Sequence, residues 1–368
     1  MAPKRILQVI GGLDNGGSQA MILNIYRKID REKVQFDFIV DHPDEMYFAS
    51  EVKALGGKIH IMPTFTGFNL QEILKAWNDF FITHPEYKII HAHVRSYASI
   101  FLSIAKKHGL VTISHSHSTS SGKGLKAVVK NILQIRLRYV ADYMMSCSYH
   151  AGEWLFGKKA ADSERHFVIN NAVDVPKYVY SKARSDEQRE KWGIPDDAFV
   201  VGHVGRFCEV KNHSFIVDVF AEVLKKEQNA FLLLVGDGET LEMTKQKAKE
   251  LCVIDRIVFT GQSEDVPELL CAMDVLMFPS LYEGLPVTLI EAQGTDLPCV
   301  VSDTVDEKSN IGGDFVRLPL EDSAEKWAIA VINAKKEQRC DKTELIVKNG
   351  YDISQTSEWI KEFYLSHI

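Results

Sequence analysis

Short apolar runs rich in β-branched residues alternate along the chain with longer stretches in which apolar positions recur at helical spacing. Runs of this length are typical of buried strands, and their alternation with amphipathic helices is typical of βαβ units that form a parallel sheet. In the first half, the expected strands are Arg5–Ile10, Phe36–Val40, Lys58–Met62, Ile89–His93, Val111–His115, Tyr143–Ser146 and Phe167–Ile169, and the expected helices are Ser18–Lys28, Phe48–Ala54, Leu70–His84, Ala98–His108 and Leu125–Val140.

The same alternation begins again near residue 199. Two successive series predict an α/β protein with two doubly wound, Rossmann-like domains. In the second series, the expected strands are Phe199–Val204, Ala230–Val235, Ile257–Phe259, Val275–Phe278 and Cys299–Ser302, and the expected helices are His213–Lys226, Glu239–Leu251, Val266–Met273 and Leu289–Gln293.

Composition marks the boundaries between the predicted domains. Residues 174–198 are polar and include Pro176, Pro195 and a charge run from Lys182 to Lys191, which is typical of a linker with a short helix. Apolar positions at helical spacing predict a last helix over Ser357–His367. We therefore expect an N-terminal domain at 1–173, a linker at 174–198, a second domain at 199–349 and a C-terminal helix within 350–368.

The overall composition is that of a soluble globular protein, with 45% hydrophobic and 25% charged residues. No apolar run approaches the roughly 20 residues that span a bilayer, and the N-terminus lacks the pattern of a signal peptide. We expect a cytoplasmic protein. The six cysteines form no Cys-x-x-Cys pair, so zinc and redox motifs are absent, and we expect mostly buried free thiols.

Charge is distributed unevenly between the two halves. Residues 1–172 hold 21 basic and 15 acidic residues, whereas the whole chain, with 43 basic and 50 acidic residues, has a net charge of −7. Residues 87–141 contain no acidic residue at all. The stretch lacks interleaved aromatic residues, so we expect no nucleic acid as partner; an anionic membrane surface, at the inner face of the plasma membrane, or a phosphate-bearing acceptor fits better.

Glycine-rich turns follow several predicted strands. Gly11-Gly12 and Gly16-Gly17 lie between the first strand and its helix, where backbone amides and the helix dipole favour an anion. The spacing differs from the dinucleotide pattern Gly-x-Gly-x-x-Gly, and a tight turn without a ligand is the alternative. Gly236, in the run Val235–Gly238, follows a strand of the second series in the same way.

Two basic residues open the second series. Arg206 comes directly after a strand in Val204-Gly205-Arg206, and Lys211 follows five residues later. The carboxyl edge of an open α/β sheet binds ligands, and a planar guanidinium with a nearby ammonium group suits a diphosphate. The alternative interpretation is a pair of ordinary surface cations.

The most specific pattern is a pair of glutamates, Glu283 and Glu291, separated by seven residues. Glu283 lies in a loop after a strand, and Glu291 lies within the following helix. The amides near Val287 and Thr288 are at the predicted helix start and can receive a phosphate. Carboxylates on both sides of that start can accept hydrogen bonds from sugar and ribose hydroxyls, although either glutamate alone would more often be a solvated surface acid.

Taken together, these motifs resemble the retaining GT-B glycosyltransferases of family GT4. The resemblance rests on Glu283 to Glu291, on Val204–Arg206 with Lys211-Asn212, on Val235–Gly238 and on the glycine-rich first loop. Residues 151–157 and 171–174 are similar to the exopolysaccharide-assembly branch, the EpsF-like enzymes. The resemblance implies an acceptor-side N-terminal domain and a donor-binding second domain that face a cleft, with the final helix crossing back onto the N-terminal domain. It also implies a nucleotide-sugar donor, which we expect to be UDP-linked, and a glycan or lipid-linked acceptor.

The family also implies roles for matching positions. Arg206 and Lys211 would hold the donor diphosphate, Glu283 the donor sugar and Glu291 the ribose. His117 matches a first-domain histidine near the donor hexose, with His115 as a rival in the run Ser114–Ser118. The remaining donor-binding positions are Gly16, Gly17, Gly205, Gly236, Gly284, Leu285, Val287 and Thr288. Transfer would need no metal ion or other cofactor, because the cations and helix amides neutralise the leaving diphosphate.

One position departs from the family pattern. Asp296 stands before Leu297-Pro298 where the family usually has glycine, and Asp adopts a positive φ less readily than glycine does. The local turn is therefore in question, whereas the catalytic residues are intact.

Three other functions remain as alternatives at this point. A nucleotide-sugar epimerase shares the two-domain layout, and a non-catalytic subunit could bind a nucleotide-sugar. A nicotinamide-dependent oxidoreductase is disfavoured by the glycine spacing and by the lack of a suitable acid, since Asp41 is the one candidate.

Overall fold

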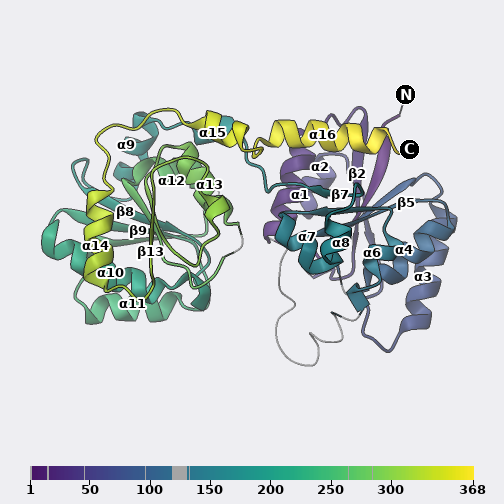
Figure 1. Ribbon diagram of the computed structural model, residues 1–368, viewed down its shortest axis with the longest axis horizontal. Helices are drawn as coiled ribbons and strands as arrows, with labels where there is room; N and C mark the ends of the chain where they lie inside the picture. Colours follow the sequence, from purple (N-terminus) through teal and green to yellow (C-terminus); the bar gives the residue numbers. More distant parts are fainter. Residues whose placement is uncertain are drawn as a thin grey trace. The chain divides into compact units, whose positions relative to one another are not determined.

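The computed structural model describes residues 2–14, 16–44, 46–95, 97–117, 131, 133–263, 265–283 and 285–368. It divides into two compact units, each an α/β structure with helices around one sheet (Figure 1). The first unit comprises Met1–Ala172 together with Asp352–Ile368, and the second comprises Val173–Tyr351.

The first unit is built on a seven-stranded sheet in the order β3-β2-β1-β4-β5-β6-β7, and every pairing in it is parallel. Strand β1 lies near the middle, where Ile6 is opposite both Phe36 of β2 and Ile89 of β4. The strands are β1 (Lys4–Val9), β2 (Val34–Val40), β3 (Ile59–Ile61), β4 (Ile89–Ala92), β5 (Val111–Ser116), β6 (Tyr143–Ser146) and β7 (His166–Val168).

Helices cover both faces of this sheet because successive residues of each strand point to opposite sides. Ile6 packs in a core cluster with α1 and the C-terminal helix, whereas Leu7 packs in a second cluster with α3 and α4. The helices of the unit are α1 (Gly17–Lys28), α2 (Ala49–Ala54), α3 (Leu70–Thr83), α4 (Ala98–Lys107), α6 (Leu137–Val140), α7 (Tyr149–Phe156), α8 (Lys158–Ala161) and α16 (Ile353–Leu365).

The last helix, α16, belongs to the first unit although it is the end of the chain (Figure 1). Its buried face includes Ile360 and Phe363, which pack with residues of α1 and β2. The hydroxyl of Ser357 donates to the carbonyl of Ile25 in α1 across 3.4 Å. The helix begins four residues before the predicted Ser357, because Asp352 caps it by accepting from the amide of Ser354.

The second unit repeats the architecture with six strands in the order β10-β9-β8-β11-β12-β13, again with parallel pairings. The strands are β8 (Phe199–Val204), β9 (Ala230–Val235), β10 (Ile257–Gly261), β11 (Val275–Phe278), β12 (Cys299–Ser302) and β13 (Phe315–Leu318). The α-helices are α9 (Lys182–Lys191), α10 (His213–Lys226), α11 (Leu241–Glu250), α12 (Val266–Ala272), α13 (Val287–Gly294), α14 (Ala324–Asn333) and α15 (Thr343–Lys348), with 3-10 turns η1 (Val175–Tyr178), η2 (Glu209–Lys211), η3 (Ile254–Arg256) and η4 (Glu307–Ser309).

The segment expected as a linker, residues 174–198, packs as part of the second unit. Arg189 of α9 is buried, and its guanidinium donates to the carbonyls of Ala272 and Ala198. A buried arginine with carbonyl partners fixes α9 against α12 and the start of β8. The segment therefore contributes to a core instead of joining two cores.

Several other expectations differ from the structure. Helices α7 and α8, strand β13 and helices α14 and α15 lie in regions where we predicted no element. Residues 125–130 and 132 of the predicted helix Leu125–Val140 lie outside the described residues, and α6 is the described end of this segment. Of the six cysteines, Cys271 and Cys299 are buried, whereas Cys252 and Cys340 are exposed, so the expectation of mostly buried thiols is wrong. No helix among the described residues is long and apolar enough to cross a bilayer.

Candidate active site

Neighbouring strands of the second unit carry the predicted donor-binding residues at their carboxyl ends. Strands β8 and β11 pair in parallel, so the loops that follow them emerge side by side. The amide of Leu281 donates to the carbonyl of Val210 across 2.8 Å, and the side-chain amide of Asn212 donates to the carbonyl of Pro279 across 3.2 Å. These bonds hold the loop with Lys211 against the loop with Glu283.

Lys211 and Glu283 form an ion pair, with 2.6 Å between Nζ and Oε1. The lysine ammonium also lies 4.5 Å from the centre of the Phe278 ring. Only 18% of the lysine side chain and 16% of the glutamate side chain are exposed, so solvent screens the pair weakly. The structure therefore brings together two residues that the sequence assigned to diphosphate and sugar.

Glycines let the two basic residues approach a neighbouring loop closely. Gly236 has a φ of 138°, and a Cβ atom there would lie 2.1 Å from the carbonyl oxygen of Gly205. A Cβ atom at Gly205 would lie 3.2 Å from Cε of Lys211. The amide of Gly205 donates to the carbonyl of Val235 across 2.9 Å. The backbone crossing thus requires glycine at 236, whereas a side chain at 205 would press on the Lys211 side chain.

Arg206 lies at the same sheet edge but is held loosely. Its side chain is 73% exposed, and its nearest acidic partner is Glu239, with 3.6 Å between the closest atoms. An exposed pair at this distance contributes little to folding. The guanidinium is therefore available to an anionic ligand, which agrees with the predicted role.

Helix α13 begins at Val287, as the pattern predicted. Pro286 is the N-cap residue and provides no side-chain cap, so the first amides of the helix, including those of Val287 and Thr288, keep their hydrogen-bonding capacity for a ligand. Leu285 packs beside the second-unit core. Gly284 lies outside the described residues.

Glu291, the second glutamate of the pair, lies on α13 and accepts a hydrogen bond from the hydroxyl of Tyr178 across 2.5 Å. Burial raises the pKa of the Glu291 carboxyl, and the hydrogen bond from Tyr178 lowers it. Burial together with the nearby Glu291 charge raises the pKa of Tyr178 well above its usual value. The carboxylate is thus held by a neutral donor and keeps an oxygen that can accept from another hydroxyl.

The other predicted residues lie in the first unit. Gly16 is the N-cap residue of α1 with an extended backbone, and Gly17 begins the helix. Among the described residues, a Cβ atom at Gly17 would meet no atom within 4 Å, so the space beside this first helical residue is open. An uncapped helix start of this kind can bind an anion.

His117 and its rival His115 have different environments. His115, in β5, is 1% exposed and lies in a cluster with His91 of β4, whereas His117 follows the end of β5 and is half-buried. Burial and the nearby Arg95 charge lower the pKa of His117 to about 4. Burial and neighbouring histidines hold the pKa of His91 and His115 well below the usual value. These imidazoles are therefore neutral near pH 7.

Sequence reasoning missed two sets of residues at these sites. Tyr178, the partner of Glu291, carried no signal because it is 113 positions away in a segment expected to be a linker. The partners of His117 carried a signal that we did not use. The sequence contains two His-x-His pairs, His91 with His93 and His115 with His117. Each pair lies at the carboxyl end of a strand, β4 or β5, that we predicted as consecutive, and a spacing of two places both members of a pair on one face.

Known proteins are similar to this chain in sequence and in fold. The family model of glycosyl transferases group 1 matches residues 184–352, and that of Glycosyltransferase Family 4 matches residues 15–177. The EpsF protein of Bacillus subtilis (strain 168), a glycosyltransferase by name, is 32% identical over 96% of this chain and 94% of its own length. The chain belongs to glycosyltransferase family 4. The enzyme is accordingly a glycosyltransferase.

Two further similarities are more distant. An Escherichia coli enzyme named UDP-Gal:alpha-D-GlcNAc-diphosphoundecaprenol alpha-1,3-galactosyltransferase is 24% identical over 77% of this chain and 76% of its own length. The crystal structure of Anabaena HepE in complex with UDP and glucose matches 98% of this chain and 99% of that chain, with a TM-score of 0.75 and 19% identity. The glycosyltransferase thus has the GT-B fold, as the resemblance implied.

Proposed function

We propose that the glycosyltransferase moves a hexose from a UDP-sugar to a glycan or lipid-linked acceptor during surface polysaccharide assembly, with retention at the anomeric carbon. The observation that carries the proposal is the Lys211–Glu283 ion pair, because it places a cation and a sugar-binding carboxylate beside the N-terminus of α13. Incoming phosphate would draw Lys211 toward the diphosphate, and Glu283 would then be free to accept from sugar hydroxyls.

The choice of substrates is supported by similarity. HepE was crystallised with UDP and glucose, and the E. coli relative is named for a UDP-galactose donor and a diphosphoundecaprenol-linked acceptor. A Staphylococcus aureus relative, 22% identical over 98% of this chain, is named for capsular polysaccharide biosynthesis. These names favour a UDP-sugar and a lipid-linked acceptor for this chain.

In the proposed mechanism, Arg206, Lys211 and the amides of α13 stabilise the negative charge that grows on the departing diphosphate. Glu283 orients the sugar, and Glu291 accepts from ribose hydroxyls. The leaving phosphate takes the acceptor proton on the same face of the sugar. Because cations and amides fill the role that a metal ion has in other transferases, we propose that transfer needs none.

The test measures donor turnover with UDP- and GDP-linked hexoses, with and without a lipid-diphosphate-linked sugar. Acceptor-dependent release of UDP, with product whose anomeric configuration by NMR equals that of the donor, is the expected result. Conversion of the donor without acceptor would identify an epimerase, and an inverted product would reject the retaining mechanism. Activity should persist in excess chelator; complete loss restored by Mg²⁺ or Mn²⁺ would reject metal independence.

We also propose that residues 87–141 bring the cytoplasmic enzyme to an anionic membrane at the inner face of the plasma membrane. Several basic residues of this stretch, Lys123, Lys126 and Lys130, lie outside the described residues, whereas Lys106 is already paired with Asp142 at 2.5 Å. Each basic side chain near such a surface contributes about 1 kcal/mol, so attachment would be reversible and sensitive to salt.

Sedimentation with phosphatidylglycerol and phosphatidylcholine vesicles tests the membrane proposal. Replacing Lys123, Lys126 and Lys130 by Glu should abolish binding to the anionic vesicles. Replacing Lys158 and Lys159 of α8, which are exposed but lie outside the acid-free stretch, is the matched control and should change binding little. Equal binding to both vesicle types would reject this proposal and leave the transferase proposal intact.

A further inference from the structure

A chain of hydrogen bonds inside the first unit begins at His117. Its Nε2 lies 2.8 Å from Nδ1 of His93, and Nε2 of His93 lies 2.8 Å from the side-chain oxygen of Gln8 in β1. That oxygen can only accept, so Nε2 of His93 carries the hydrogen. A neutral imidazole carries one hydrogen, so Nδ1 of His93 is an acceptor and His117 donates to it through Nε2–H.

The chain continues on the other side of Gln8. The side-chain nitrogen of Gln8 donates to the hydroxyl of Tyr364 in α16 across 3.2 Å, and that hydroxyl lies 2.7 Å from Nδ1 of His91. Nε2 of His91 lies 3.2 Å from Nδ1 of His115. Among the described residues, Nδ1 of His91 is the remaining partner of the Tyr364 hydroxyl, so the hydroxyl hydrogen goes to His91, and His91 then donates to His115 through Nε2–H.

The amide of Gln8 gives this chain its direction. Each imidazole and the hydroxyl can reverse by moving hydrogens, but an amide oxygen and an amide nitrogen cannot exchange roles without rotation of the whole group. With the oxygen toward His93 and the nitrogen toward Tyr364, every imidazole in the chain carries its hydrogen on Nε2. The chain ends at Nε2 of His115, which is buried without a hydrogen-bond partner among the described residues.

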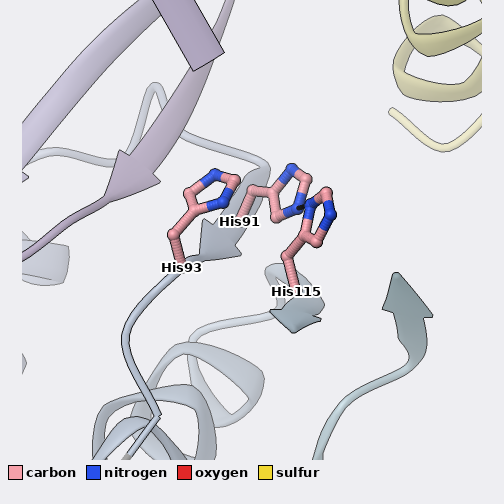
Figure 2. Close-up of side chains that lie close together, drawn as sticks. All are labelled: His91, His93 and His115. Carbon is pink, nitrogen blue, oxygen red and sulfur yellow. Dashed lines mark hydrogen bonds between the residues drawn. The ribbon is translucent and has the colours of Figure 1, made fainter. Parts of the chain in front are cut away.

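A metal site is the competing explanation for this cluster. One nitrogen each from His91, His93 and His115 lie within 4.8 Å of one another (Figure 2). Zinc binds imidazole nitrogens at about 2.0–2.1 Å, so tetrahedral ligand atoms would be about 3.3 Å apart, with ring planes that converge on the ion. The rings of His91 and His93 are instead stacked, with centroids 4.3 Å apart and an interplanar angle of 28°.

The surroundings also disfavour a cation. The small cavity beside the cluster, about 10 Å³, is lined on its other sides by apolar residues of α1, β2 and α16, and no carboxylate contributes to it. A divalent ion there would be buried without a compensating negative charge, which is costly. The stacked rings and the continuous hydrogen bonds fit a chain of neutral imidazoles.

We propose that Gln8 and Tyr364 are positioning residues that fix His117 as the Nε2–H tautomer, leaving Nδ1 to accept a hydrogen bond from a hydroxyl of the sugar substrate. The inference rests on the proposed function, in which His117 contacts the sugar. It assigns an active-site role to the C-terminal helix, whose Tyr364 is 1% exposed and accepts from the Gln8 amide nitrogen. The hydrogen-bond partner of a histidine commonly selects its tautomer in this way.

The tautomers can be measured without any substrate. Long-range ¹H–¹⁵N NMR of the full chain labelled at histidine, near pH 7.5, distinguishes Nε2–H from Nδ1–H and from the cation. We expect Nε2–H for His91, His93, His115 and His117, assigned by single His→Gln variants. A Nδ1–H or cationic His117 in the wild-type protein would overturn the inference.

Two substitutions then connect the tautomer to turnover. In Gln8→Met, the directing amide is lost, so His117 should become a mixture of tautomers and kcat for transfer should fall about tenfold, while UDP affinity stays unchanged because UDP binds the second unit. Tyr364→Phe keeps the ring but removes the hydroxyl that accepts from the Gln8 amide, so the amide can rotate. This variant should also mix the His117 tautomers and lower kcat. Gln35→Met is the matched control, since Gln35 accepts from Tyr26 in the same unit but does not belong to the hydrogen-bond chain that starts at His117.

The outcomes separate this inference from the proposed function. A wild-type protein that transfers sugar but has His117 as Nδ1–H would refute the inference and leave the function standing. A protein that turns over no nucleotide-sugar yet shows the Nε2–H pattern would refute the proposed transferase function and leave the inference about the hydrogen-bond chain standing. If Gln8→Met mixes the tautomers and kcat does not change, or if Gln35→Met lowers kcat equally, the positioning role is rejected.

Discussion

The hydroxyl of Tyr178 donates a hydrogen bond to Glu291 across 2.5 Å, joining the 3-10 turn η1 to helix α13. This contact makes the segment before α9 part of the candidate active site, although it resembles a linker in composition. This hydrogen bond restrains the Glu291 carboxylate. In the proposed function, it orients Glu291 for the ribose before any nucleotide binds.

Replacing Tyr178 by Phe tests this relationship. The ring remains, so we expect a folded protein whose UDP affinity is reduced about fivefold at pH 7, the effect of one hydrogen bond. Tyr178 lowers the pKa of Glu291, which burial raises. The pKa should therefore rise further in the variant, and UDP affinity should begin to fall at a higher pH as the solution is acidified. Isothermal titration calorimetry over pH measures both effects.

The matched control is Tyr180→Phe, two residues along the same segment, where the ring packs under the guanidinium of Arg339. It should leave UDP affinity and its pH dependence unchanged. Equal losses in the two variants would mean that the segment, not the hydroxyl, matters. Glu291→Ala should weaken UDP binding more strongly than Tyr178→Phe does.

Arg206 and Lys211 should respond differently to removal. Arg206 is exposed, so Arg206→Ala should change stability by less than about 0.5 kcal/mol, yet lower kcat roughly 100-fold because the guanidinium faces charge that grows as UDP leaves. Lys211→Ala leaves Glu283 mostly buried without its partner, so it should cost about 1–3 kcal/mol of stability as well as activity. Thermal unfolding and steady-state kinetics measure the two effects.

Lys211→Ala combined with Glu283→Ala serves as the control. Removing both partners should recover part of the lost stability but none of the activity. A stable Lys211→Ala protein, or an Arg206→Ala protein with wild-type turnover, would contradict the assigned positions.

The alternation of strands and helices was visible in the sequence wherever apolar runs are uninterrupted. The prediction of elements from this alternation failed between β12 and the last helix. Strand β13 is half-exposed and contains Arg317, so it lacks an apolar run. Helix α14 did carry a start signal, because Ser323 caps it by accepting from the amide of Lys326 and Trp327 and Val331 face the core. That signal was available and unused.

The candidate site was predictable where its residues follow predicted strands or lie close in sequence. Lys211 and Glu283 follow strands β8 and β11, which placed them at the carboxyl edge of the sheet, and Glu283 and Glu291 flank one helix start. The contacts that support the site join residues far apart, such as Gln8 with Tyr364, 356 positions away. Such pairings depend on the packing of α16 in the first unit, which no local pattern specifies.

Asp296 is the position where the family pattern and the chain disagree. It adopts a φ of 55°, the left-handed conformation that a glycine would take there. Its carboxylate accepts from Lys336 and from the amide of Cys340, each across 2.8 Å, which compensates for the backbone strain. Burial alone would raise the pKa of this carboxyl, but these two partners lower it.

Asp296→Gly should therefore destabilise the second unit, although it relieves the strain. Relief is worth about 1 kcal/mol, whereas the loss of two hydrogen bonds to a buried carboxylate costs about 2–4 kcal/mol. Asp296→Asn keeps the shape of the side chain, so its free energy of unfolding should lie between those of the wild type and Asp296→Gly. Chemical denaturation measures the difference, and a more stable Asp296→Gly protein would show that strain dominates at this turn.

The enzyme should lose stability in mild acid because of its buried histidines. Burial lowers the pKa of His91, His93, His115 and His203 well below 6.5, and burial with the nearby Lys211 charge lowers that of His213 to about 4. These groups are neutral in the fold but take up protons on unfolding. Stability is therefore complete above pH 6.5 and decreases as the pH falls, by about 1.4 kcal/mol per pH unit for each histidine.

His213→Phe isolates one of these contributions. The His213 ring is 2% exposed and stacks on Phe207 with centroids 3.9 Å apart, and both of its nitrogens lack hydrogen-bond partners among the described residues. Phenylalanine fits the stack without unsatisfied nitrogens, so stability should rise by about 1 kcal/mol at pH 7. The gain should grow as the pH falls toward 5, because the variant no longer takes up that proton on unfolding.

The measurement is chemical denaturation of wild type and variant between pH 5 and pH 8. His150→Phe is the control, because His150 also contacts an aromatic ring, that of Tyr149, but its side chain is 65% exposed. It should leave the dependence of stability on pH unchanged. A His213→Phe protein with the wild-type slope, or with lower stability at pH 5 than the wild type, would show that His213 makes a polar contact in solution that offsets its burial.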